Sequence, residues 1–472
     1  MKKLISLFIT ASVAAASLTS MSSAESTTAT DTTVIYDNLE YTIVNDTLIE
    51  LSGCTDKTVT SVNIPAEIDG RAVIAGASVF SECPELIEII VDDDNSCIED
   101  IDGVLFEKNS RILLDYPRGL SGEYTIPDGT KIIDDKAFEN ASELTFVSLP
   151  DSLEIIGMSS FRNCTSLTGF SKPLPITYGG SISGCTALKA IEIAEAEAGT
   201  ILTNLKFIDC PALESVIIPD CYLLNESFIL RNCPMITEIQ LPENSLLSSV
   251  NISGCESITS LDFTGLDIET INISDLPSLE NISIDSSDPL DAGTTSLDIK
   301  DCENLKSLDL TGVGIGNLDI KNLDSLESIS INYVGNTKNG FGIDFDTCPK
   351  LKDVYCYGSE WIIERNIKAV ADNNVTVHML RSNTSLQKYL TQYNVNYVYI
   401  DDEMIYGDAN CDGEVNMADA VSIMQHISNP DKVQLTDLGI KFADVANTGD
   451  GLTNLDALEI QKYKLGLVET LD

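Results

Sequence analysis

The sequence predicts an α/β repeat solenoid rich in strands, followed by a C-terminal cap and a small all-α module. Two observations predict the solenoid: a motif recurs every 21 to 26 residues from Ala141 onward, and its apolar residues alternate as they do in strands. A third predicts the module, because an acidic loop-plus-helix unit is written twice near the C-terminus. We therefore expect a signal peptide over 1–24, the solenoid over 25–358, the cap over 359–402 and the module over 403–472.

The N-terminus has the features of an export signal. Lys2 and Lys3 give a basic start, Leu4–Leu18 is an apolar run, and Ser22–Ala24 is a small-residue cleavage site. The apolar run is too short for a membrane span, and no later stretch is long enough. We expect a secreted, extracellular protein with no membrane association.

The composition is strongly acidic. Lys and Arg number 28 and Asp and Glu number 74, so the formal net charge is −46. Such a surface repels nucleic acid and anionic membranes, keeps a secreted protein solvated and concentrates cations. We therefore expect no nucleic-acid partner.

Each repeat contains one equivalent position, which we call the slot, three residues before a Leu or Ile. The motif Leu-x-x-Ile-x-Ile follows in many repeats, as in Leu279–Ile284, and in several a second alternating strand precedes the slot, as in Leu297–Ile299. Stacking such repeats buries a continuous core that no single repeat forms alone. Cysteine fills the slot at Cys83, Cys164, Cys185, Cys210, Cys233, Cys255, Cys302 and Cys348, and other residues fill it at Ala141, Leu276 and Leu323.

The cysteine pattern argues against disulfides in the array, although exported chains often contain them. Alanine or leucine replaces cysteine in some slots, which an obligatory crosslink does not allow, and a free buried cysteine behaves as a small hydrophobe. We expect an inward-facing ladder of reduced thiols from Cys83 to Cys348. One cysteine per repeat also lacks the close pairs of a zinc site.

The early repeats resemble bacterial BspA-like leucine-rich repeats. The resemblance rests on Ile132–Phe138 and Ile155–Phe161, which contain a short helix signal, and on a strand-rich insertion over 102–127. It covers about residues 34–400, and after residue 165 the repeats lose the helix signal and read as strand–turn–strand. The resemblance implies a leucine-rich-repeat solenoid with an adhesive function.

The end of a solenoid needs a cover, and residues 359–402 read as one. The sequence predicts helices over Trp361–Ala371 and Ser385–Tyr393, and strands over Thr376–Leu380 and Tyr397–Ile400. Trp361 is the one tryptophan, and we interpret it as a core residue of this cap.

The duplicated unit near the C-terminus has the spacing of a loop that wraps a hard cation. In the first copy, oxygen-bearing side chains fall at loop positions 1, 3, 5, 9 and 12, with glycine at 6, over Asp408–Asp419. The second copy, Asp444–Asp456, is one residue longer. The apolar residue at position 8, Val415 or Leu452, is expected to join the two loops across a small core.

This unit resembles a type I-like dockerin, the calcium-dependent module that docks onto a cohesin of a cellulosome scaffold. The resemblance implies two calcium ions as cofactors and a cohesin as partner. It implies as metal ligands Asp408, Asn410, Asp412, Glu414 (by its backbone carbonyl), Asn416 and Asp419, and in the second loop Asp444, Asn447, Asp450 and Asp456. It places the cohesin-facing positions at Met417, Ala418, Met424, Gln425, Leu455, Gln461 and Lys462.

Residues for catalysis are scarce. His378 and His426 are the two histidines and fall in the cap and the helical module, so a Ser-His-Asp or Cys-His site within the repeats has no base. A glycosidase needs only two carboxylates, but it also needs aromatic walls, and aromatic residues make up 6% of the chain. We expect no enzymatic activity, with a polysaccharide-degrading hydrolase as the least favoured alternative.

Two nonenzymatic functions remain for the array. It binds another protein, which the scarcity of aromatic residues and the short polar side chains at outward positions favour, or it binds plant cell-wall polysaccharide and targets the complex to its substrate. The outward positions are Gln240, Asp262, Ser283, Asp309 and Ser330.

Overall fold

The computed structural model is a strand-rich solenoid with helices near its C-terminal end. It describes residues 33–109, 111–176, 180–197, 200–242, 245–264, 266, 268–284, 295–334, 342–343, 347–356, 361–380, 383–400, 406–409, 415–429, 435, 437–446, 452–468 and 470–471. The chain divides into two compact units between Leu120 and Ser121. No helix in these described ranges combines the length and the apolar character that crossing a bilayer requires.

The first unit is built from short strands in three groups. A five-stranded sheet has the order β1-β2-β3-β6-β5, β4 pairs with β7 in parallel, and β9 lies between β8 and β10 in antiparallel pairing. The strands are β1 Thr33–Tyr36, β2 Leu39–Ile43, β3 Leu48–Cys54, β4 Ser61–Ile64, β5 Glu67–Ile68, β6 Arg71–Ala75, β7 Glu88–Val91, β8 Ile98–Ile101, β9 Val104–Glu107 and β10 Ile112–Asp115.

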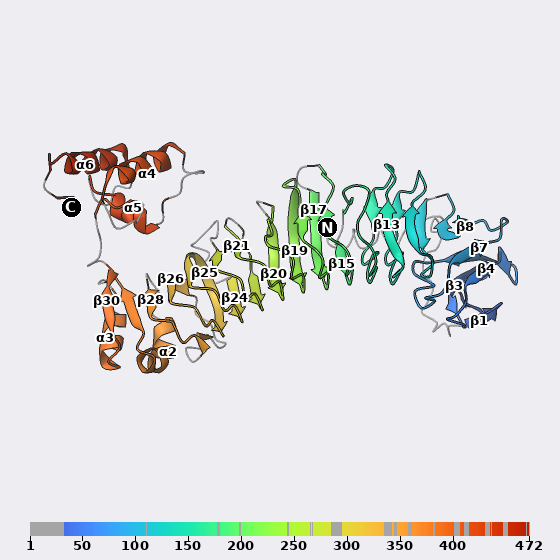
Figure 1. Cartoon of the computed structure of the whole chain (residues 1–472), viewed down its shortest axis with the longest axis horizontal. Helices are drawn as coiled ribbons and strands as arrows, with labels where there is room; N and C mark the ends of the chain where they lie inside the picture. Colours follow the sequence, from blue (N-terminus) through green and yellow to red (C-terminus); the bar gives the residue numbers. More distant parts are fainter. Residues whose placement is uncertain are drawn as a thin grey trace, which may run out of the picture. The chain divides into compact units, whose positions relative to one another are not determined.

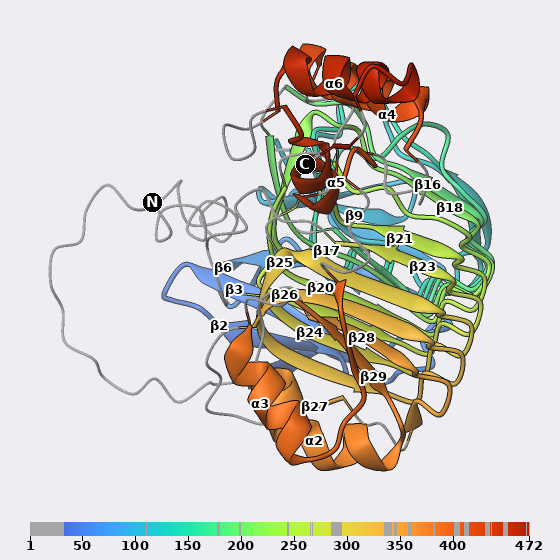
Figure 2. The same cartoon turned by 90° about the vertical axis from the view of Figure 1, so that its left-hand side faces the viewer.

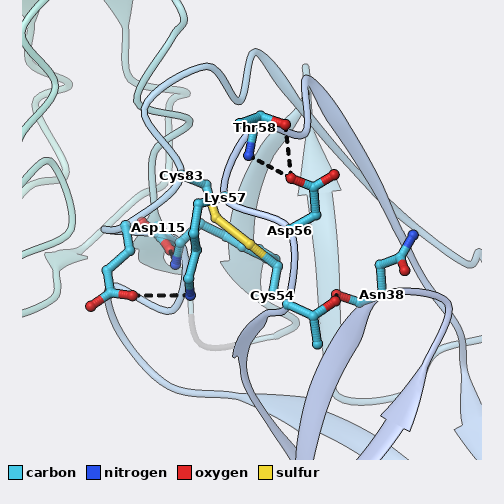
Figure 3. The surroundings of a disulfide bond; sticks show 10 residues. Asn38, Cys54, Asp56, Lys57, Thr58, Cys83 and Asp115 are labelled. Atoms are coloured by element: carbon cyan, nitrogen blue, oxygen red, sulfur yellow. Dashed lines mark hydrogen bonds and ion pairs between the residues drawn. A yellow bond between two sulfur atoms is a disulfide. The ribbon is translucent and has the colours of Figure 1, made fainter.

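The disulfide between Cys54 and Cys83 in this unit corrects the prediction of an entirely reduced ladder (Figure 3). Cys83 occupies a repeat slot, but Cys54, at the end of β3, belongs to no slot, so the repeat pattern gave no sign of a partner. The other seven ladder cysteines are free and buried: Cys164, Cys185, Cys210, Cys233, Cys255, Cys302 and Cys348. The expectation of reduced, inward-facing thiols is therefore confirmed for these seven.

The second unit stacks its strands so that strands of successive coils pair in parallel, with register shifts in some pairs such as β19 with β20 (Figures 1 and 2). One long sheet runs in the order β15-β17-β19-β20-β22-β24-β25-β26-β28-β29-β30, and shorter pairs line the other side of the coils. The early strands are β11 Gly122–Thr125, β12 Ile132–Ile133, β13 Leu144–Ser148, β14 Ile155–Ile156, β15 Ser181–Ser183, β16 Ala190–Glu192, β17 Thr200–Ile208, β18 Ser215–Ile217 and β19 Tyr222–Arg231. The later ones are β20 Leu246–Ser253, β21 Ser260–Asp262, β22 Thr270–Ser274, β23 Asn281–Ser283, β24 Thr295–Lys300, β25 Ser307–Lys321, β26 Ser328–Val334, β27 Gly342–Ile343 and β28 Asp353–Cys356.

The early repeats differ from the expectation in one respect, because their helix signals fold as turns. Residues 135–140 and 158–163 are turns, and Lys136 and Ser159 within them have positive φ angles of 58° and 57°. A left-handed residue interrupts the helical hydrogen-bond pattern, so a helix cannot propagate through so short a segment.

The slot itself is the first residue of a tight turn. In the coil of Cys210, the slot carbonyl accepts a hydrogen bond from the backbone N–H of Leu213 at 3.0 Å, which explains the fixed spacing of three residues. The residue before the slot adopts a left-handed conformation, which Asn, Asp and Gly tolerate best. This column comprises Asn140, Asn163, Gly184, Asp209, Asn232, Gly254, Asp275, Asp301 and Asn322.

The predicted cap is present, and its elements continue the long sheet. Helices α2 (Trp361–Asp372) and α3 (Thr384–Gln392) alternate with strands β29 (Thr376–Met379) and β30 (Tyr397–Tyr399), and β29 pairs with β28 (Figure 2). Buried apolar residues of both helices, such as Val370 and Leu386, contribute to the core. The side chain of Trp361 lies outside the described part of the structure.

Candidate functional site

The C-terminal module contains three helices around a small apolar core. These are α4 (Met417–Ser428), α5 (Asp437–Ala443) and α6 (Asn454–Lys464). The buried cluster contains equivalent residues from the two copies, Ala420 and Ile423 from α4 and Ala457 and Ile460 from α6. Val415 and Leu452 both pack against this cluster, as the spacing predicted. The duplicated sequence therefore folds as one unit that shares a core.

Both copies begin their helix with the same capping box. In α4, the Asn416 side chain accepts a hydrogen bond from the N–H of Ala418, and Asp419 accepts one from the N–H of Asn416, each at 2.7 Å. In α6, Thr453 and Asp456 take the same roles at 3.2 and 2.8 Å. These bonds satisfy backbone donors that the first helical turn leaves free. The last residue of each predicted loop is thus also the third residue of the helix.

Asp456 additionally closes the second loop. Its Oδ1 accepts hydrogen bonds from the N–H groups of Val445 and Ala446, both at 2.8 Å, so the loop's last residue reaches back to its first residues. Asp456 is fully buried and Asp444 is half-buried. This contact shows that the thirteen-residue spacing still brings the two ends of the loop together.

The first loop is held at its start by Gly407. Its φ angle is +95°, and a Cβ at this position would meet the side chain of Leu471 at 2.5 Å. Its N–H donates to the carbonyl of Phe442 at 2.7 Å, which ties the start of the first loop to the end of α5. Sequence reasoning missed this residue; the signal was a glycine directly before the first loop aspartate.

The predicted metal ligands are partly described. Asp408 and Asp419 are buried, with 3% and 0% of their surface exposed, and Asn416 is half-buried. Asn410, Asp412, Glu414, Asn447 and Asp450 lie outside the described residues. Among the described residues alone, no group of three or more His, Cys, Asp or Glu side chains is arranged to hold a metal. The donors that are described are carboxylate and amide oxygens, which suit calcium and not a soft metal.

The cohesin-facing positions lie mostly on the surface of α4 and α6. Met417, Met424 and Leu455 are 50%, 44% and 53% exposed, so large apolar side chains gather on the surface of these two helices. Ala418 and Gln425 are exposed, and Gln461 and Lys462 are half-buried. Lys462 is paired with Glu459 at 2.8 Å.

Two apolar residues of the same helices were missed. Val421 and Leu458 are 49% and 43% exposed, and each directly follows the Asp-Ala pair that both copies contain. The sequence signal for them was an apolar residue that, in both copies, does not fall on the face of the helix predicted to be buried. Together with the positions named above, they give each helix an exposed apolar surface.

The two histidines lie in different elements and have different contacts. His378 lies on β29, stacks on Tyr355 with ring centroids 4.2 Å apart, and has its Nε2 2.8 Å from Asp353. This pair is part of the sheet that leads into the cap. The Nδ1 of His426 accepts from the N–H of Leu435 at 3.4 Å within the helical module.

The outward polar positions of the array lie where the alternation predicted. Gln240, Asp262, Ser283 and Asp309 are exposed, and Ser330 is half-buried. These residues follow the slot in their coils.

Comparison with known proteins finds similarity for part of the repeat array and for a short segment of the chain. The family model of the BspA type leucine rich repeat region (6 copies) matches residues 121–196 and 179–285. The chain is 47% identical to a chain in the solved structure of the third ScaB cohesin of R. flavefaciens in complex with a group 1 dockerin, over 14% of this chain and 96% of that chain, with a TM-score of 0.14.

Two further matches are a curated sequence and a solved structure. A xylanase/beta-glucanase of Ruminococcus flavefaciens is 43% identical over 74 residues, and the chain spans only 9% of that relative's length. A leucine-rich repeat protein from Bacteroides ovatus is 15% identical, with 78% of this chain and 99% of that chain covered and a TM-score of 0.38.

Proposed function

Because the chain carries a BspA-type leucine-rich-repeat region and a dockerin-like segment, we propose that it is a secreted, noncatalytic binding component of a cellulosome. The dockerin-like module attaches it to a scaffold cohesin in a calcium-dependent manner, and the repeat array binds another protein. The observation that carries the proposal is the duplicated loop-plus-helix unit, with matching capping boxes and one shared core.

Calcium is proposed as the cofactor of both loops. Asp408, Asn416 and Asp419 of the first loop, with Asp444 and Asp456 of the second, are the described residues that would hold it, and Asn410, Asp412, Glu414, Asn447 and Asp450 are proposed from the sequence. The ion supplies positive charge that offsets the repulsion between carboxylates gathered in a short loop. Its binding is therefore coupled to the folding of the module.

The cohesin is proposed to bind the exposed apolar surface of α4 or α6. Met417, Met424, Val421, Leu455 and Leu458 supply large apolar side chains, and burying them on a partner removes apolar area from water. Ala418, Gln425, Gln461 and Lys462 are proposed to complete the contact. Because the helices are equivalent in the duplicated unit, either one is a possible docking surface.

The calcium proposal is tested by cohesin binding measured by calorimetry, with the full chain in calcium and after chelation. We expect Asp408→Ala/Asp412→Ala to leave the first loop unable to hold calcium and to weaken binding. Adding Asp444→Ala/Asp456→Ala removes compensation by the second loop, and we then expect binding to be abolished. Asp128→Ala/Asp220→Ala, two exposed aspartates of the array, is the matched control. Unchanged affinity in the fourfold variant would falsify the assignment.

The ligand of the array is tested separately, because it does not depend on the cohesin. Cosedimentation of the chain on insoluble plant cell wall, cellulose and xylan distinguishes the two ligand classes. Retention that soluble sugar displaces supports polysaccharide binding. If the chain instead stays in the supernatant and crosslinks to a secreted protein at low micromolar concentration, the result supports a protein as the ligand of the array.

A further inference from the structure

A polar hollow lies on the outer face of the long parallel sheet, across four neighbouring strands, β19, β20, β22 and β24. Its volume is about 320 Å³, at the lower end of the range for small-ligand sites. The polar residues that line it are Arg231, Asn251, Ser253, Asn272, Ser274, Asp298 and Lys300.

The hollow results from side-chain size along two columns of the sheet. In one column Arg231, Ser253, Ser274 and Lys300 occupy paired positions, and in the next column Asn251, Asn272 and Asp298 do. The middle strands carry short side chains and form a floor, while the longer Arg231 and Lys300 rise at the two ends. Three strand spacings separate these ends, about 14 Å, which is room for a short oligosaccharide.

The hollow has unused hydrogen-bonding capacity. Within the described part of the chain, the guanidinium of Arg231 and the side chains of the four floor residues Asn251, Ser253, Asn272 and Ser274 make no hydrogen bond to protein groups. At the opposite end, Asp298 Oδ1 is buried and accepts no hydrogen bond from a described group, while its Oδ2 lies 3.5 Å from Lys300 Nζ. A buried acceptor such as Asp298 Oδ1 is costly unless a ligand or water satisfies it, whereas the exposed guanidinium of Arg231 is open to a ligand.

The charges of the hollow favour one end for an anion. Asp298 and Lys300 offset each other, so Arg231 leaves a positive charge at the β19 end. The chain as a whole carries −46. At physiological ionic strength, however, distant charges are screened over about 8 Å. The nearby guanidinium of Arg231 therefore dominates the electrostatic potential at this end of the hollow.

We propose that this hollow binds an acidic oligosaccharide. The sugar carboxylate pairs with the Arg231 guanidinium, a geometry suited to two parallel hydrogen bonds. Hydroxyls lie over the amide and hydroxyl floor, and one donates to Asp298 Oδ1. An extended peptide is less suited, because these strands are already paired on both sides and offer no free backbone edge. The proposal rests on the alternative in which the array binds polysaccharide, and it is independent of cohesin attachment.

The test is calorimetric titration of the full chain with trigalacturonic acid at physiological ionic strength. We expect saturable binding with one site per chain, and no comparable binding of neutral cellotriose. Arg231→Met should weaken the affinity about tenfold or more, because a charge-assisted hydrogen bond is lost. Ser274→Phe, which fills the floor, should abolish binding.

Arg162→Met is the matched control, since Arg162 is an exposed arginine of the same array that contacts Glu139 and lies outside the hollow. Circular dichroism and urea unfolding check that every variant is folded. Equal affinity of Arg231→Met and the wild type, or no binding of trigalacturonic acid at millimolar concentration, overturns the proposal. Equal binding of a tetraglutamate peptide, with the same loss in Arg231→Met, overturns the sugar assignment and indicates an acidic peptide.

Discussion

Buried thiols in the repeat slots shape the chemistry of the array at the residue scale. Cys164 Sγ donates to the carbonyl of Phe138 at 3.1 Å, and Cys185 Sγ donates to that of Phe161 at 3.0 Å, so each thiol hydrogen-bonds the preceding coil. Burial is the main cause that raises the pKa of Cys255 to about 11 and that of Cys302 to about 12. At these two positions the fold therefore favours the protonated thiol.

This shift predicts how Cys302→Ala behaves with pH. The raised pKa of Cys302 stabilises the fold fully below its ordinary value of 9.0, and the contribution is lost as pH rises from there toward 12. We expect the destabilisation caused by Cys302→Ala, measured by urea unfolding, to shrink by up to about 1.4 kcal/mol for each pH unit above 9. Leu323→Ala, in an equivalent slot, should cost the same at every pH. A constant cost for Cys302→Ala across this range would contradict the assignment.

The buried ion pair of the first unit gives a second prediction. Arg118 Nη1 lies 2.6 Å from Asp115 Oδ1, both side chains are fully buried, and the N–H of Phe80 donates to Asp115 Oδ2 at 2.7 Å. Burial raises the pKa of Asp115, and Arg118 opposes that rise. We expect Arg118→Met to destabilise the unit by about 3–5 kcal/mol, because it leaves a buried carboxylate uncompensated.

The double variant Asp115→Asn/Arg118→Met provides the control for this pair. It removes both charges, so we expect it to be less destabilised than the sum of the single variants in urea unfolding. Additive costs would show that the two charges do not stabilise each other.

At the scale of the element, the exposed apolar residues of α4 and α6 predict the cohesin contact. We expect Val421→Glu/Leu458→Glu to weaken cohesin binding about tenfold or more, because it puts a charge at the centre of both equivalent apolar surfaces. Each single variant should retain binding through the other helix. Calorimetry measures the affinity, and Ser428→Glu/Asn454→Glu, exposed at helix ends, is the control. Cohesin binding unaffected by the double variant would place the contact elsewhere.

Elements with strong local signals were predictable from the sequence. The cap elements are within two residues of the predicted bounds, because apolar periodicity specifies them locally. The turns at 135–140 and 158–163 were not predictable in this way, because the short length of the coil overrides the local helix propensity there. The Cys54–Cys83 pairing and the hollow depend on contacts between coils, which a single repeat does not encode.

The candidate metal site was only partly predictable for a related reason. The loop spacing and the dockerin resemblance predicted Asp419 and Asp456 as calcium ligands, and that role stays a prediction. The hydrogen bonds that both make at the start of their helices were not predicted. Val421 and Leu458 were missed because an apolar residue in an amphipathic helix is ordinarily assigned to the core. Their exposure becomes visible only when the core of the module is known.

At the scale of the whole molecule, the ends of the stacked array are the places where an uncovered sheet edge could pair with other chains. Strand β28 pairs with β29 over four residues, and Val354 and Cys356 of β28 are buried. Deleting residues 361–400 would leave the edge of β28 that faces β29 unpaired, although β28 still pairs with β26, and would expose this apolar surface. We expect the shortened chain to self-associate, because an uncovered sheet edge pairs with other chains.

Light scattering after size exclusion measures this effect at several protein concentrations. Deletion of residues 406–472 is the control, since it leaves β28, β29 and β30 in place and should give a monomer-like particle of the expected mass. A monomeric product with unchanged urea stability after deletion of 361–400 would show that the cap is not needed to protect the sheet.

The seven free ladder thiols belong to seven different coils, and each is shielded only while its own coil stays closed. An alkylating reagent that is present in solution therefore marks a coil each time it opens, and the mark is permanent. The extent of alkylation at each of these cysteines therefore records how often its own coil has opened. Peptide mapping after timed exposure measures the alkylation of each cysteine and ranks the coils by how often they open locally.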